Sequence, residues 1–219
     1  METYERKELM NIISKLVTWG LVDYIHARRK DNKDGYLCNW ADEAPLEDNG
    51  LEYTCGESKG VIIASSVDWV IKFTIPNEDR DMCAREYENY VLAKEAGLAY
   101  YFAEMKFLTA IGGINFYAQE MVECDESVDN SLSEKLARHY ESIGEKPEEG
   151  VEWELLDEVE NMSAVERVDL LYGDAELCRF IEDRHINDLH CGNFGIAGDR
   201  YVMIDYSGFG SQVFMDKPE

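Results

Sequence analysis

The residue pattern of the stretch 51–122 limits the possible fold of this chain more than any other feature. Short runs rich in β-branched and aromatic residues recur there, and Gly112-Gly113 separates two of them, which is typical of a two-residue hairpin turn. A helical pattern over 82–96, ended by Gly97, interrupts the series. We therefore predict the order strand, strand, strand, helix, strand, strand, with strand runs at 61–64, 69–75, 107–111 and 114–119.

The flanking segments are mainly helical in pattern. Apolar residues at three-to-four spacing predict one amphipathic helix over 5–30, whose apolar side we expect to pack on the chain's own domain. Residues 31–50 are polar and are predicted to form a loop. A second helix is predicted over 170–184. The stretch 141–160 holds nine acidic residues and one lysine, which indicates a solvated insertion or helix face, or a surface that recruits a basic partner.

The charge of the chain excludes some partners. It has 46 acidic residues against 21 Lys and Arg, a net charge of −25, in 219 residues. Such a field repels nucleic acids and anionic membranes and attracts basic proteins. The six cysteines form no C-x-x-C pair, and no long apolar run or signal peptide is evident, so we expect reduced thiols in a cytoplasmic protein without structural zinc.

Three polar residues near the C-terminal end form a pattern with chemical meaning. Asp188 precedes Asn193 by five positions, and Asp205 follows an apolar β-type run over 201–204. One acid can accept a hydroxyl proton, while the amide and the second acid can hold Mg²⁺ against phosphate groups. Magnesium prefers oxygen ligands and keeps several waters, so two protein ligands suffice. This pattern indicates a phosphotransferase.

A lysine within a predicted strand fits the same chemistry. Lys72 lies inside DWVIKFTI, so its ammonium can project from a rigid element onto phosphate oxygens. Either Glu86 or Glu88 of the following helix could pair with Lys72. We choose Glu86, because Tyr90 one turn further would pack inward on the same side, and Glu88 stays open.

The ordered set resembles the protein-kinase superfamily over about residues 51–210. The set begins with a glycine-containing segment, CGESKGV, with Gly56 and Gly60. In chain order it continues with the strand lysine, the helix glutamate, the hairpin, the Asp-x-x-x-x-Asn motif and an aspartate at the end of a strand. The motifs that carry the resemblance are VIK at 70–72, DLHCGN at 188–193 and IDYSG at 204–208.

Two details refine this resemblance. His190, two residues after Asp188, makes the loop similar to that of aminoglycoside and choline phosphotransferases and of small kinase-like proteins of bacteria and phages. The segment QEMVE at 119–123 resembles the hinge after the fifth kinase strand, where main-chain groups from Glu120 to Val122 would meet adenine.

The resemblance implies an α+β, protein-kinase-like fold of two lobes. The N-lobe, residues 51–122, would hold a five-stranded antiparallel sheet with one helix. Residues 1–50 would be a helical extension. Residues 123–219 would form a truncated, mainly helical C-lobe with an acidic insertion at about 127–163.

The resemblance also assigns roles in ATP and Mg²⁺ chemistry. Lys72, paired with Glu86, would hold the α- and β-phosphates under the loop Gly56, Ser58 and Gly60. Asp188 would orient and deprotonate the acceptor hydroxyl. The metal ligands would be Asn193 and Asp205, and His190 would touch the γ-phosphate or stabilise its loop.

These assignments predict an Mg-ATP-dependent Ser/Thr protein kinase acting on a host or partner protein with a basic surface. Some positions depart from the kinase pattern: Ile186-Asn187 replaces His-Arg, Ser207 replaces a glycine, and Glu219 ends the chain soon after Asp205. The alternatives are a pseudokinase that binds ATP and regulates a partner, a small-molecule phosphotransferase of the aminoglycoside type, and an acidic nucleic-acid mimic that inhibits a nucleic-acid-binding protein.

Overall fold

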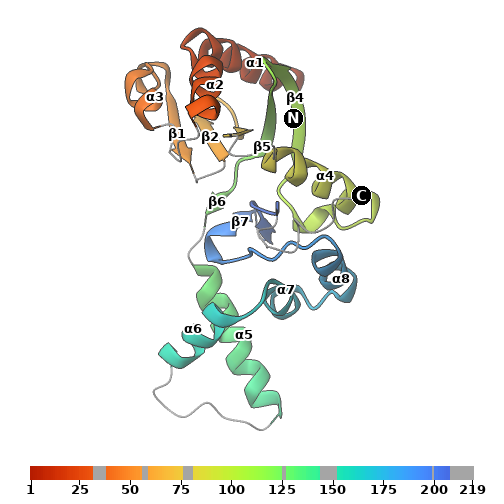
Figure 1. The fold of residues 1–219 in the computed structure, drawn as a ribbon. Coiled ribbons are helices and arrows are strands. Elements are labelled where there is room, and N and C mark those ends of the chain that lie inside the picture. Colours follow the sequence, from red (N-terminus) through yellow and green to blue (C-terminus); the bar gives the residue numbers. More distant parts are fainter. Residues whose placement is uncertain are drawn as a thin grey trace. The chain divides into compact units, whose positions relative to one another are not determined.

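The computed structural model describes residues 1–31, 38–55, 59–75, 81–124, 127–143, 152–198 and 200–207 (Figure 1). The chain divides into two compact units, one of Met1–Val91 with Glu104–Met121 and one of Leu92–Ala103 with Val122–Glu219. Among the described residues, no helix has both the length and the apolar composition needed to cross a membrane.

The first unit contains a five-stranded antiparallel sheet, and the chain is α+β as predicted. The order in the sheet is β1-β2-β3-β5-β4, so β3 lies at the centre, and every residue of β3 is buried. The predicted order of strands and helix along the chain is confirmed. The strands are β1 (Leu51–Cys55), β2 (Lys59–Ala64), β3 (Trp69–Thr74), β4 (Met105–Ile111) and β5 (Ile114–Glu120).

The turn between β4 and β5 needs glycine, as the sequence indicated. Gly112 and Gly113 have φ angles of 57° and 76°, which side chains with a Cβ rarely adopt. A Cβ on Gly112 would also lie 2.5 Å from Cγ1 of Val22. The carbonyl of Gly112 accepts a hydrogen bond from Nε2 of His26 at 2.6 Å, so this turn is held against the N-terminal helices.

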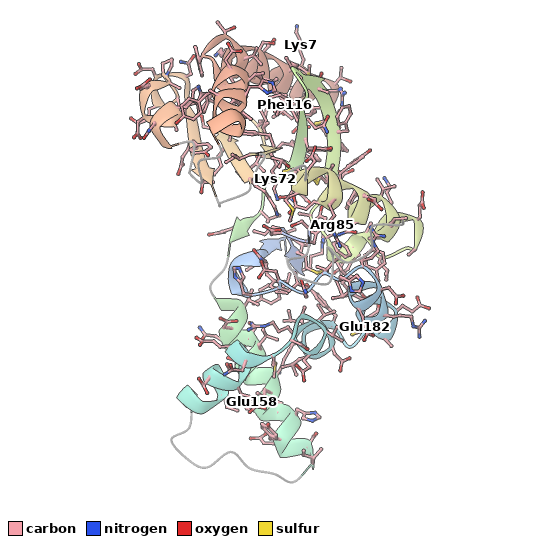
Figure 2. The ribbon with its side chains drawn as sticks, viewed as in Figure 1. Lys7, Lys72, Arg85, Phe116, Glu158 and Glu182 are labelled. Atoms are coloured by element: carbon pink, nitrogen blue, oxygen red, sulfur yellow. The ribbon has the colours of Figure 1, made fainter. Side chains whose placement is uncertain are left out.

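The prediction of one helix over 5–30 is wrong, because the structure has two: α1 (Thr3–Thr18) and α2 (Leu21–Asp31). Gly20 has a φ of 83° directly after the C-cap of α1, a left-handed position that ends a helix. Leu9 and Leu21 are fully buried and share one hydrophobic core with the sheet, which also contains Phe116 of β5 (Figure 2). The apolar side of both helices therefore packs on the first unit itself.

The loop predicted for 31–50 is wrong for part of its length. The structure has a short helix α3 (Cys38–Glu43) and a 3₁₀ turn η1 (Glu47–Asn49) there. Trp40 explains this order: it is only 4% exposed, and its Nε1 donates to the carbonyl of Trp19 at 3.0 Å. A buried indole whose N–H is satisfied holds a segment that is otherwise polar.

Helix α4 (Met82–Glu95) agrees with the predicted 82–96 and is fixed at its N-terminus. Asp81 accepts the N–H of Ala84 at 2.9 Å through Oδ1, the contact of a helix N-cap. The same carboxylate accepts the hydroxyl of Thr74 on β3 at 2.6 Å and Nδ2 of Asn115 on β5 at 2.7 Å. The start of α4 is thus tied to two strands of the sheet.

The second unit is mainly helical, and the structure has helices α5 and α6 within the acidic stretch 127–163. The prediction of one helix over 170–184 is wrong: Gly173, with a φ of 62°, ends α7, and Asp174 caps α8.

A small antiparallel sheet in the second unit joins β6, β7 and β8. The elements are α5 (Ser127–Ile143), α6 (Glu152–Asn161), α7 (Ala164–Tyr172), α8 (Ala175–Asp183), β6 (Glu123–Cys124), β7 (Phe194–Ala197) and β8 (Arg200–Met203), with 3₁₀ turns η2 (Ala99–Tyr101) and η3 (Cys191–Asn193).

Candidate functional site

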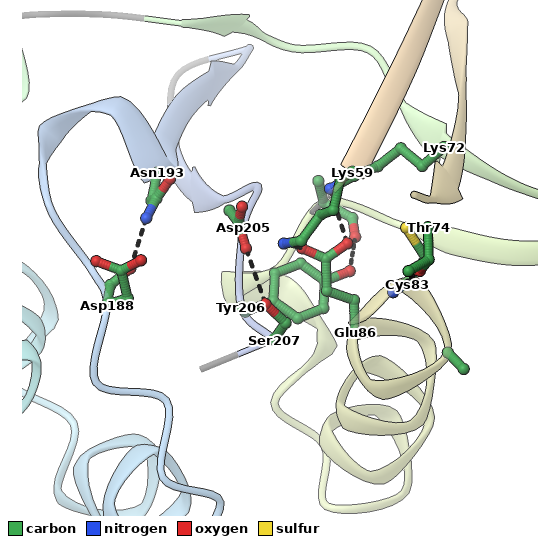
Figure 3. Close-up of polar contacts among 12 residues, drawn as sticks. Lys59, Lys72, Thr74, Cys83, Glu86, Asp188, Asn193, Asp205, Tyr206 and Ser207 are labelled. Atoms are coloured by element: carbon green, nitrogen blue, oxygen red, sulfur yellow. Dashed lines mark hydrogen bonds and ion pairs between the residues drawn. The ribbon is translucent and has the colours of Figure 1, made fainter. Parts of the chain in front are cut away.

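Lys72 lies on β3, the central strand of the first unit, and forms a buried ion pair with Glu86 of α4. Its Nζ is 2.7 Å from Oε2 of Glu86, and the two side chains are 5% and 0% exposed (Figure 3). The sequence favoured Glu86 over Glu88, and Glu88 is exposed while Tyr90 is buried. The expected pair is present, and its role toward phosphate stays a prediction.

Lys59 of β2 binds the other oxygen of the same carboxylate, which sequence reasoning missed. Its Nζ lies 2.7 Å from Oε1 of Glu86, and Lys59 is 5% exposed. Glu86 therefore holds two ammonium groups, one on each oxygen (Figure 3). Hydrogen bonds between charged groups are stronger than neutral ones, and burial strengthens them further.

The register of the sheet explains why Lys59 and Lys72 converge. Lys59 pairs with Thr74 and Val61 pairs with Lys72 across the β2–β3 ladder. Residues two apart on a strand share a face, and directly paired residues point to the same side. The signal was therefore present in the sequence, since a hairpin closed near Ser65 puts the lysine of CGESKGV on the face of Lys72.

Contacts around Glu86 fix the first turns of α4. Thr74 accepts the N–H of Cys83 at 3.0 Å and donates to Asp81, so β3 and α4 are bonded beside the two lysines. Burial raises the pKa of the Cys83 thiol to about 12, and the negative charge of Glu86 adds to this effect. The thiol beside the carboxylate is therefore neutral, and Lys59 and Lys72 each contact this carboxylate with a charged group.

Of the three loop residues expected to cover the phosphates, the structure describes Gly60. Gly56 and Ser58 lie outside the described residues. Gly60 is on β2, where a Cβ would come within 2.4 Å of Cζ of Phe73 on β3. Close packing against an aromatic ring therefore explains glycine at this position, independently of any bound phosphate.

Asp188 and Asn193 are brought together in the second unit. Nδ2 of Asn193 donates to the main-chain carbonyl of Asp188 at 2.5 Å (Figure 3). The main chain of Asn193 is also fixed, because its carbonyl accepts the N–H of Ile204 at 2.9 Å. With Nδ2 turned to Asp188, Oδ1 is the amide atom suited to a cation, and an amide oxygen is a fitting ligand for Mg²⁺.

His190 shapes the loop between these two residues. Its Nδ1 accepts the N–H of Gly192 at 3.1 Å, so in the neutral ring the proton is on Nε2. A Cβ on Gly192 would lie 3.0 Å from Cε1 of His190, which makes this turn tight. Of the two roles expected for His190, this contact supports stabilisation of the loop; contact with a γ-phosphate stays a prediction.

Asp205 lies two residues after Met203, the last residue of β8, and is half-buried. Its Oδ1 accepts the hydroxyl of Ser207 at 3.3 Å. Between them, Tyr206 is fully buried and donates its hydroxyl to the carbonyl of Ala103 at 3.0 Å. The anchored tyrosine fixes the backbone that carries Asp205, a hard oxygen ligand of the kind that Mg²⁺ prefers.

The predicted adenine-binding segment is partly engaged within the protein. The N–H of Glu120 donates to the carbonyl of Glu104 at 2.8 Å, and the N–H of Met121 donates to that of Asp68 at 3.1 Å. Adenine recognition by this segment would therefore rely on main-chain groups other than these two donors. Val122 packs against Gly195 in the second unit, where a Cβ on Gly195 would lie 2.4 Å from its Cγ2.

The site residues thus form two sets, one in each unit. The described residues contain no cluster of three or more His, Cys, Asp or Glu side chains able to hold a metal ion. The predicted Mg²⁺ ligands, one amide and one carboxylate, still match a cation that keeps most of its own water. Searches of protein families, curated proteins and solved structures found no match to this chain.

Proposed function

We propose that this protein is an Mg-ATP-dependent phosphotransferase with a protein-kinase-like fold, acting on Ser or Thr hydroxyls of a basic protein. The observation that carries the proposal is the buried ion pair between Lys72 of the central strand and Glu86 of α4. A charged pair is costly to bury, and its presence at the centre of a sheet supports a functional role for these two residues.

In the first unit, Lys72 would bind the phosphate oxygens of ATP. Glu86 would orient its ammonium, and the bonds from Asp81 to β3 and β5 would hold α4 in place. Because phosphoryl transfer needs positioning and charge neutralisation above all, a rigid lysine contributes directly to it.

In the second unit, Asp188 would accept the proton of the acceptor hydroxyl as its oxygen bonds to the γ-phosphorus and the bond to the leaving ADP oxygen breaks. Asn193 and Asp205 would hold Mg²⁺, which neutralises phosphate charge when bound. The hydrogen bond from Asn193 to Asp188 would keep the base and the metal ligand in one geometry.

The net charge of −25 supports a basic acceptor. An acidic surface raises the encounter rate with cationic proteins, and the effect falls as salt screens it. Aminoglycosides are also cations, so they form one arm of the test.

A second candidate is a pseudokinase that binds ATP without transferring phosphate. The hydroxyl of Ser207 already donates to Asp205, and a metal would have to compete with this bond. In that case Asp205 would serve the loop, and the protein would act on its partner by binding.

The test is transfer of label from γ-labelled Mg-ATP to the protein itself, to basic proteins and to aminoglycosides. The variants are Asp188→Asn and Asp205→Asn, and Asp183→Asn, on the exposed end of α8, is the matched control. We expect label on a basic protein, with loss of about 10²-fold or more in both variants and none in the control.

Other outcomes discriminate among the alternatives. Label on aminoglycosides alone would assign the small-molecule reaction. Binding of Mg-ATP without transfer to any acceptor would support the pseudokinase. A wild-type protein that neither binds nor transfers would refute both and leave the acidic nucleic-acid mimic.

A further inference from the structure

We infer that Lys59 is a second phosphate-binding lysine, so that the nucleotide phosphates are held by ammonium groups from two adjacent strands. This inference rests on the proposed function and names a residue to which the kinase resemblance assigned no role. It starts from the geometry of Glu86, which binds Lys59 Nζ and Lys72 Nζ at 2.7 Å each.

The ammonium groups of Lys59 and Lys72 lie close to the same carboxylate. Both ammonium groups lie within hydrogen-bond distance of one carboxylate, and the two side chains share a face of the β2–β3 ladder. Lysine places a compact charge on a flexible stem and can move its donors without moving the backbone. A phosphate chain that reaches Lys72 is therefore also within reach of Lys59.

Both lysine side chains are buried, which is costly for a charged group. Lys59 is 5% exposed and Lys72 is 4% exposed, and lysine is rarely buried to this extent. Two ammonium groups held beside one another attract a polyphosphate more strongly than one, because their attractions to the anion add.

The position of Lys59 in the sheet also holds it near Glu86. Lys59 is the first residue of β2. Its backbone pairs with Thr74, whose hydroxyl is bonded to Asp81 at the start of α4. The lysine is thus held by the same framework that positions Glu86.

The experiment compares the binding of Mg-ATP, Mg-ADP and adenosine by calorimetry. The variants are Lys59→Met and Lys59→Arg. Lys106→Met is the matched control, since Lys106 lies on the same sheet and also pairs with a glutamate, Glu104, at 3.0 Å. We expect Lys59→Met to weaken Mg-ATP about tenfold and adenosine not at all, Lys59→Arg to restore most of the affinity, and the control to match wild type.

Equal Mg-ATP affinity in wild type and Lys59→Met would overturn the inference and leave Lys59 as a structural partner of Glu86. An equal loss for adenosine and Mg-ATP in a folded Lys59→Met variant would also overturn it, because Lys59 would then support the site as a whole and not the binding of phosphate. Failure of the proposed function is distinct: the wild-type protein would then bind none of the three ligands, or would bind Mg-ATP without transfer.

A measurement on the unchanged protein covers the case in which Lys59→Met does not fold. An ATP analogue with an acyl phosphate acylates amines beside its phosphate chain, and peptide mass mapping locates the product. Acylation of Lys59 that excess Mg-ATP prevents supports the inference. Acylation confined to Lys72, with Lys59 unmodified, contradicts it.

Discussion

Nζ of Lys72 lies 2.7 Å from Oε2 of Glu86, a carboxylate with no exposed surface. The lysine comes from the central strand of a five-stranded antiparallel sheet, and the glutamate comes from the helix that follows this strand in the chain. Because Lys59 binds the other oxygen, the carboxylate is the centre of a buried cluster of three charged residues, Lys59, Glu86 and Lys72.

The first prediction concerns the charge at the centre of this cluster. Glu86→Gln keeps the shape of the side chain but removes the charge that both lysines face. Leaving buried ammonium groups without that charge should lower the free energy of unfolding by roughly 3–5 kcal/mol. Urea unfolding measures it, and Glu88→Gln, exposed on the same helix, should stay within about 0.5 kcal/mol of wild type. Equal stability of the two variants would contradict the burial of the pair.

The second prediction separates packing from ligand binding at Gly60. The ring of Phe73 leaves no room for a Cβ, with 2.4 Å to Cζ, so Gly60→Ala should destabilise the protein by about 1–3 kcal/mol without any ligand. In the double variant Gly60→Ala/Phe73→Leu, the loss of stability should be smaller than the sum of the losses in the two single variants. Additive effects in thermal or urea unfolding would show that the ring is not the obstacle.

The third prediction is a pH dependence of stability in the second unit. The hydroxyl of Tyr101 donates to Asp174 at 2.6 Å, and the N–H groups of Glu176 and Leu177 at the start of α8 donate to the same carboxylate. These bonds lower the pKa of Asp174 below its usual value of 3.8, with the tyrosine as the largest cause. The folded state therefore releases this proton more readily than the unfolded chain.

The ionised carboxylate of Asp174 therefore stabilises the folded state above pH 3.8, and this stabilisation is lost as the pH falls through the lowered pKa of the folded state. Asp174→Asn removes the titrating group, so stability should fall less steeply with acid between about pH 5 and 2. Urea unfolding over this range measures the slope, with Asp183→Asn as the control at the other end of α8. Parallel slopes for wild type and Asp174→Asn would refute the assignment.

The fourth prediction uses Cys83 as a reporter of the first unit. Its thiol is fully buried and has a pKa raised to about 12, so at pH 8 only about one molecule in 10⁴ carries the thiolate. Alkylation of Cys83, followed by peptide mass mapping, should therefore be slow in the folded protein and fast in urea. Cys178, partly exposed on α8, serves for comparison in the same digest. Rapid alkylation of Cys83 without denaturant would show that the region around Glu86 opens easily.

Local sequence signals were sufficient where a single short motif determines the backbone. Gly112-Gly113 predicted the hairpin because only glycine adopts both φ angles at little cost, and the strand pattern around Lys72 placed it in the sheet. The choice of Glu86 succeeded because the helical period puts it on the side of the buried Tyr90.

The features that were missed depend on contacts between distant residues or on a single break in a long pattern. Gly20 interrupts a continuous apolar period, so one helix was expected where two are present. Trp40 orders a polar segment through a bond to Trp19, which no local pattern reveals. A turn near Ser65 sets the register that puts Lys59 on the face of Lys72, but its contact with Glu86 also depends on how α4 packs on the sheet.

The most direct test of the central claim is the calorimetric affinity of Mg-ATP for the wild-type protein, for Lys72→Met and for Lys106→Met. The account predicts saturable binding by wild type and by Lys106→Met, and at least about tenfold weaker binding by Lys72→Met, because the ammonium held by Glu86 would no longer meet the phosphates. Identical affinity of wild type and Lys72→Met, or no binding by the wild-type protein, would contradict it.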